Sequence, residues 1–249
     1  MGYKLLTKEM KSRQGWYNEM DWSDVGEWHE ATGHGGLCTE GVLHDYDDPW
    51  IAAVMHPAHV QIADPVMYET ERGGDIETDG LKCGSKRLRL TRQVDLPDVP
   101  LVQRVAFGIF ASLRAYRCPD YVVWAGKWLS GEDRSAASAV RAAGLAGPDL
   151  AISAAAYAAE AASCSAAVAA AYAAEAASCS AFVAAAYADA GDEGVGFDAT
   201  IACAARNAVR ATRNAARAAA EAAAEIAWND RGLDWADWSE IAAAARQIV

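Results

Sequence analysis

The 249-residue sequence is short of positive charge, with 22 lysine and arginine residues against 34 aspartate and glutamate residues and a net charge of −12. Nucleic acids and anionic membrane surfaces are bound by clusters of lysine and arginine, because these clusters neutralise their negative charge. We therefore expect a protein that binds neither nucleic acid nor membrane. With 53% hydrophobic residues, the chain can still form a substantial core.

Paired cysteines and a secretion signal are also absent. None of the six cysteines forms a CxxC pair, and three of them lie in alanine-rich stretches that predict helix interiors, so we expect buried free thiols. The N-terminus places Lys4, Lys8 and Lys11 among isolated apolar residues and lacks the apolar run of a signal peptide. These features predict an intracellular protein, located in the cytoplasm of a host cell.

Common catalytic signatures are missing as well, since the sequence contains no GxSxG, P-loop or GxGxxG motif. All five histidines lie between positions 29 and 59, which invites a metal site. His29 and His34, however, would lie about 140° apart on a helix instead of on one face. We expect no metal and no cofactor, and we identify no catalytic residue. This favours a non-enzymatic protein, although catalytic groups can also assemble from distant positions.

The N-terminal part of the sequence is typical of strands and turns, because short apolar runs are separated by glycine, aspartate and proline. The runs lie at 3–6, 41–43 and 66–68. The segment 86–94 alternates basic and apolar side chains, which predicts a half-buried strand. Asp48 and Pro49, which precede the apolar stretch 50–55, predict a capped short helix.

From Pro100 the apolar residues recur at helical spacing as far as Leu113, which predicts a strongly amphipathic helix. A shorter helix is predicted over 121–129. The fold class predicted from these patterns is α+β, with a small mixed α/β domain over 1–118 and an all-α, alanine-rich domain over 119–249.

The C-terminal domain contains a direct repeat, in which AAAYAAEAASCS at 154–165 recurs unchanged at 169–180. This pattern predicts one long helix over about 149–190, then a return helix over about 198–230 and a terminal helix over about 234–248. We expect the first two to form an antiparallel helical hairpin, either within one chain or between chains. A repeat of 15 residues over four turns gives about 3.75 residues per turn, which is more than the about 3.6 of a straight helix. A partner helix that follows the repeat would therefore wind with a right-handed sense.

Larger apolar side chains form one stripe along the predicted long helix, because their spacing brings them to the same side. This interaction stripe consists of Tyr157, Cys164, Val168, Tyr172, Cys179, Val183 and Tyr187. A long helix with alanine on most faces is buried better by several neighbours than by one. We therefore expect a homo-oligomer, or docking of the helices onto other proteins.

A candidate ligand site lies in the N-terminal domain. The candidate ligand residues are His44 and the basic strand residues Arg87 and Arg89. The basic strand lies beside Gly84, a residue that is able to expose backbone amides to a phosphate-bearing ligand. The alternative to a structural role is therefore a nucleotide-binding or small-molecule-binding protein, or an enzyme.

Four segments together carry a resemblance to known proteins: GVLHDYDDP (41–49), DGLKCGSKRLRL (79–90), QRVAFGIFASL (103–113) and WLSGEDRSA (128–136). They resemble uncharacterised proteins of bacteriophages, prophages and actinobacteria that combine an α/β N-terminal domain with alanine-rich helices. The resemblance implies a phage or prophage protein with a structural or interaction role, a virion component included. It assigns no activity and no catalytic residue.

A second resemblance, to ADP-ribosyltransferase-like folds, rests on residues 41–53, where a glycine and a hydrophobic pair precede a short helix. His34 with Gly35 would supply the first element of the catalytic triad of that fold, and no glutamate can be assigned to complete it. This resemblance implies an enzyme that acts on host factors.

Overall fold

The structure is a computed structural model of the chain, and it describes residues 1–12, 19–37, 39–59, 62, 64–144, 214–215, 217–224 and 235–249. The strands are β1 (Gly2–Leu6), β2 (Lys11–Ser12), β3 (Met20–Asp21), β4 (His29–Glu30), β5 (Leu43–Asp45), β6 (Val66–Thr78) and β7 (Cys83–Val94). The helices are α1 (Pro49–His59), α2 (Leu101–Ala115), α3 (Pro119–Ser130), α4 (Ala136–Gly144) and α7 (Trp235–Arg246). Residues 214–215 and 217–224 are also helical. The fold class is α+β, as the sequence predicts.

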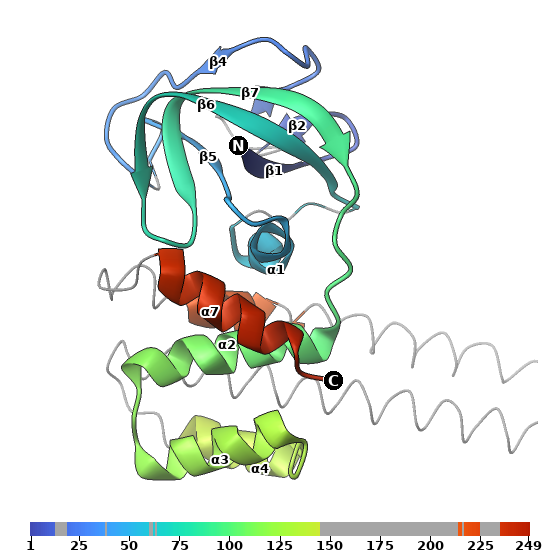
Figure 1. Cartoon of the computed structure of the whole chain (residues 1–249), viewed down its shortest axis with the longest axis vertical. Helices are drawn as coiled ribbons and strands as arrows, with labels where there is room; N and C mark the ends of the chain where they lie inside the picture. The colour runs from blue at the N-terminus through green and yellow to red at the C-terminus, as the bar shows by residue number, and fades with distance from the viewer. Residues whose placement is uncertain are drawn as a thin grey trace, which may run out of the picture.

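The main sheet is antiparallel and closes on itself. Its strands follow the order β1-β6-β7-β4, and β5 pairs with another part of β7. Tyr46, just after β5, then pairs with Tyr3 of β1 through backbone hydrogen bonds of 2.7 and 2.9 Å. Breaks in register after Glu69 and Gly73 increase the twist and bend of the β6–β7 hairpin. The hairpin therefore arches over α1 (Figure 1).

The two faces of the sheet pack against different partners, because successive side chains of a strand point to opposite sides. Leu5 and Met67 belong to the large hydrophobic core that includes α1. Leu88 and Leu90 belong to a smaller core around Trp22, whose indole Nε1 donates to Ser12 Oγ at 2.9 Å. The alternation predicted for 86–94 is confirmed, since both leucines are buried within β7.

Helix α1 begins as the sequence predicts. Asp48 Oδ1 accepts hydrogen bonds from the backbone N–H groups of Trp50 (2.7 Å) and Ile51 (3.2 Å), and Pro49 occupies the first helical position. Arg246 Nη2 also donates to both oxygens of this carboxylate, at 2.8 Å to Oδ1 and 2.6 Å to Oδ2. Asp48 therefore caps α1 and also fastens the C-terminal helix α7 to it.

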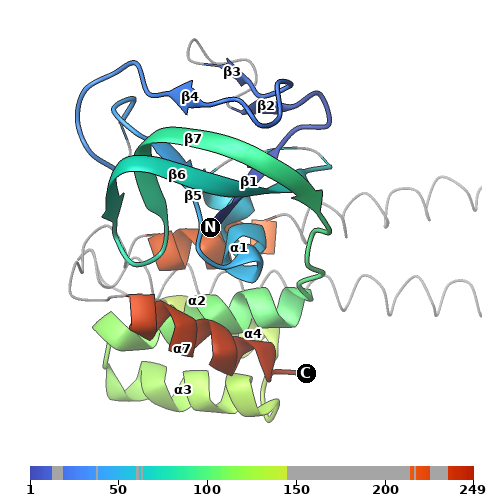
Figure 2. The same ribbon diagram turned by 45° about the horizontal axis from the view of Figure 1, so that its top comes forward.

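The helices form layers on one side of the sheet (Figures 1 and 2). Helix α2 confirms the prediction made from Pro100 onward, and α3 and α7 lie where the two later helices are predicted, although α7 ends at Arg246. A Cβ atom on Gly108 of α2 would lie only 3.0 Å from the backbone oxygen of Ala219. Small residues thus let α2 and the helical segment 217–224 approach at backbone distance.

One hydrophobic core continues from the sheet through α1 into the helices on both sides of residue 118. The described helical segments between 214 and 224 agree with part of the predicted return helix. The predicted long helix over 149–190 and its whole interaction stripe lie outside the described residues, so the helical hairpin stays a prediction. None of the helices among the described residues combines the length and the apolar composition that a membrane span requires.

Candidate functional site

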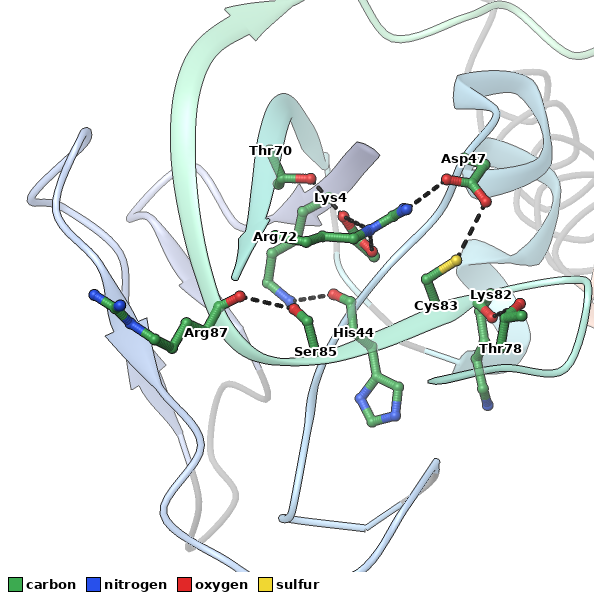
Figure 3. Close-up of polar contacts among 11 residues, drawn as sticks. Lys4, His44, Asp47, Thr70, Arg72, Thr78, Lys82, Cys83, Ser85 and Arg87 are labelled. Atoms are coloured by element: carbon green, nitrogen blue, oxygen red, sulfur yellow. Dashed lines mark hydrogen bonds and ion pairs between the residues drawn. The ribbon is translucent and has the colours of Figure 1, made fainter. Parts of the chain in front are cut away.

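A buried polar cluster joins β5, β6, β7 and the start of α1 (Figure 3). At its centre lies Arg72 of β6. Its Nε donates to Asp45 Oδ1 at 2.7 Å, and its Nη1 donates to Asp47 Oδ1 at 2.6 Å. Asp45 is the last residue of β5, and Asp47 lies two residues before α1. The Arg72 guanidinium therefore connects β6 to the end of β5 and to the segment that leads into α1.

Asp45 has further partners inside the cluster. Thr70 Oγ1 donates to Asp45 Oδ2 at 2.5 Å, and the side chain of Asp45 is fully buried. Gly2 lies directly against this carboxylate, since a Cβ atom there would be 2.0 Å from Asp45 Oδ2. The cluster therefore leaves no room for a side chain at position 2.

The thiol of Cys83 lies at the edge of the cluster, where its Sγ donates to Asp47 Oδ2 at 3.2 Å (Figure 3). Burial, with a contribution from Asp47, raises the pKa of Cys83 to about 12. A cysteine reacts as its thiolate, so this thiol is unreactive at neutral pH.

The charges in the cluster shift one another's protonation equilibria. Burial raises the pKa of Asp45 above its ordinary value, and the charge of Arg72 opposes that rise. For Arg72, burial lowers the pKa, but the attraction of Asp45 and Asp47 outweighs burial and raises the pKa overall. Lys4 adds a second cation next to the cluster, since its Nζ donates to the His44 carbonyl oxygen at 2.8 Å.

The contacts within this cluster give it mainly a structural role. The two carboxylates accept from Arg72, Thr70 and Cys83, so their lone pairs are engaged by neighbouring donors. Arg72 Nη2 is buried and, among the described residues, has no hydrogen-bond acceptor. A buried ion pair costs desolvation free energy, and its clearest effect is to fix the elements that it joins.

The three predicted ligand residues do not converge on one site. His44 lies on β5 opposite Gly84, and its ring points away from the buried cluster and from the Arg87 side chain (Figure 3). Arg87 and Arg89 both lie on β7, and each guanidinium lies over the ring of Trp28, at 4.8 and 4.9 Å from the ring centroid.

Acidic residues also accompany the two arginines. Arg87 pairs with Glu30 at 3.2 Å, and Arg89 Nε donates to Glu71 Oε2 at 2.8 Å. The structure therefore brings Arg87, Arg89 and Trp28 together on one face of the sheet, without His44 and with carboxylates that balance the arginine charge.

Sequence reasoning missed the buried cluster. Periodicity shows which strand residues share a face, but it does not show that Arg72 meets two aspartates from another part of the chain. The available signal was a pair of aspartates, Asp45 and Asp47, beside buried apolar residues at the end of a predicted strand. An acidic side chain at such a position requires a partner.

The histidines lie in different parts of the N-terminal region. His34 lies exposed in a loop, whereas His56 is partly buried within α1. Within the part of the chain that the structure describes, no three His, Cys, Asp or Glu side chains are arranged to hold a metal ion.

Comparison of the chain with models of protein families, with curated proteins and with solved structures gives no match.

Proposed function

We propose that this chain is a non-enzymatic phage or prophage protein with a structural or interaction role, whose helical region associates with copies of itself or docks onto other proteins. The observation that carries the proposal is an exposed apolar surface on the outer helix α3. Val123 of α3 is 60% exposed, and its neighbour Val122 is 39% exposed. The free energy falls when an interface removes valine side chains from water.

The buried cluster supports the same proposal. Its carboxylates, guanidinium and thiol bind one another and hold β5, β6 and α1 in place, as a rigid recognition unit requires. The raised pKa of Cys83 leaves this cluster without an activated thiol at neutral pH.

The alternative, a nucleotide-binding or small-molecule-binding protein, has one observation in its favour. Arg87 and Arg89 flank an aromatic ring, a combination that suits a planar anionic ligand. Glu30 and Glu71, however, already pair with these arginines and would repel such a ligand. The interaction role is therefore the better-supported proposal.

The test is the solution mass of the full chain, measured by light scattering over a wide range of protein concentrations. We expect a mass that rises with concentration above the 26.4 kDa of one chain. A mass of one chain at every concentration, together with no partner captured from phage-infected cells, would contradict the proposal.

A further inference from the structure

Helix α3 has two different faces. Its inner face buries Tyr121, Trp124, Ala125 and Trp128 against the rest of the protein. The opposite face presents Pro119, Val123, Gly126 and Ser130, which are all exposed. At about 100° per residue, these four positions fall within about 60° of one another. We call them the outer stripe of α3.

The outer stripe has an unusual composition for the solvent face of a helix. The side of a helix that faces water normally carries charged residues, but the stripe has none. The nearest charges lie at its flank, where Asp120 and Lys127 are both exposed. The stripe residues are spaced four, three and four apart, which is the spacing of the core positions of a coiled coil. Asp120 and Lys127 are seven residues apart, so they occupy equivalent flanking positions.

The flanking charges indicate the orientation of a partner helix. Where two α3 helices pack antiparallel around a two-fold axis, equivalent flanking positions face each other. Asp120 of each copy then lies opposite Lys127 of the other copy. In a parallel pair, each charge would instead meet the opposite flank, where Val122 and Leu129 lie.

We propose that α3 is a self-recognition helix, which packs antiparallel through its outer stripe against α3 of a second copy of this chain. This inference rests on the proposed function and names its interface. Val123 of one copy lies opposite Gly126 of the other, where no atom lies within 4 Å of the position that a Cβ would occupy. The free space over the glycine accommodates the valine of the second copy.

The position of α3 leaves this face accessible. In both views, α3 lies at the end of the molecule opposite the sheet (Figures 1 and 2). Lys127 pairs within its own chain with Glu132 at 3.2 Å, but both side chains are about half-exposed or more, so exchange of that partner costs little. A pair of 12-residue helices is about 18 Å long and smaller than a standard protein interface, so we expect a weak, concentration-dependent dimer.

The experiment uses the full chain in analytical ultracentrifugation. Val123→Asp should raise the dimer dissociation constant by at least about tenfold, because it places a carboxylate in the centre of the interface. Val140→Asp is the matched control, since Val140 is equally exposed but lies on α4. We expect this variant to dimerise like the wild type, and circular dichroism should show that both variants remain folded.

Charge reversal tests the antiparallel orientation. Asp120→Lys and Lys127→Asp should each weaken the dimer, because like charges then face each other, and the double variant should restore it. If the wild type associates but Val123→Asp has no more effect than Val140→Asp, or the double reversal gives no rescue, the interface proposed for α3 is wrong while the proposed function stands. If the wild type stays monomeric, the interface proposed for α3 is wrong, and the proposed function fails with it only if no partner is captured from phage-infected cells either.

Discussion

His56 provides a sharp prediction about the pH dependence of stability. This histidine lies in α1, and its Nε2 accepts a hydrogen bond from the backbone N–H of Ile62 at 3.1 Å. Burial, together with the nearby positive charge of Arg104, lowers the pKa of His56 from 6.5 to about 4. The ring is therefore neutral in the folded protein at neutral pH. Protonation would break the bond to Ile62 and place a second cation beside Arg104.

The sign and size of the effect follow from proton linkage. Between pH 6.5 and about 4, the unfolded chain binds a proton at His56 that the folded chain does not bind. The stabilising contribution is therefore complete above pH 6.5 and is lost as the pH falls towards 4. The difference between the two pKa values corresponds to about 3 kcal/mol.

The assay is urea unfolding followed by tryptophan fluorescence, for the wild type and for His56→Gln, at about pH 7.5 and about pH 4.5. Glutamine does not titrate and can still accept a hydrogen bond from Ile62. Between the two pH values, the wild type should lose about 2 to 3 kcal/mol more of its free energy of unfolding than the variant loses.

The carboxylates titrate in both proteins, so their contribution cancels in this comparison. His34→Gln is the matched control at an exposed position, and it should keep the pH dependence of the wild type. Equal losses of stability in the wild type and in His56→Gln would refute the assignment of His56 as a buried neutral ring.

Three further substitutions test the packing and the ion pairs through urea unfolding. Gly108→Val should destabilise the protein by about 2 to 4 kcal/mol, because its Cβ would lie 3.0 Å from the Ala219 backbone oxygen; a stable variant would disprove close contact of the two helices. Asp45→Ala should cost about 3 to 5 kcal/mol, since it removes a principal carboxylate partner of buried Arg72; a loss below about 1 kcal/mol would show that water reaches the cluster. Arg246→Met should cost about 1 kcal/mol, because the contact of its Nη2 with both Asp48 oxygens is partly exposed; unchanged stability would mean that α7 does not depend on this pair.

Local sequence patterns determined several elements of the fold. The alternation of Leu88 and Leu90 with basic residues specified the faces of β7, because strand side chains alternate whatever their partners are. Asp48 and Pro49 specified the start of α1, since a cap bonds to the next few backbone N–H groups. The helical spacing after Pro100 specified α2.

The candidate sites show how far such patterns reach. The sequence placed Arg87 and Arg89 on one face of a strand, and the structure brings both to Trp28. It also grouped His44 with them as a ligand residue, whereas the structure places the His44 ring in another direction (Figure 3). The type of a residue therefore did not show which side chains it would meet, because that depends on how the strands pair.

Contacts between residues far apart in the sequence depend on the tertiary structure. Closure of the sheet through Tyr3 and Tyr46 brings Arg72 to the two aspartates near β5. The same chain folding places Arg246 on a cap that lies 198 residues earlier. These contacts leave no periodic signal, because their free energy depends on the burial and geometry that the whole fold creates. Local conformation and the faces to be buried follow from nearby residues, whereas the partners of those faces depend on the tertiary structure.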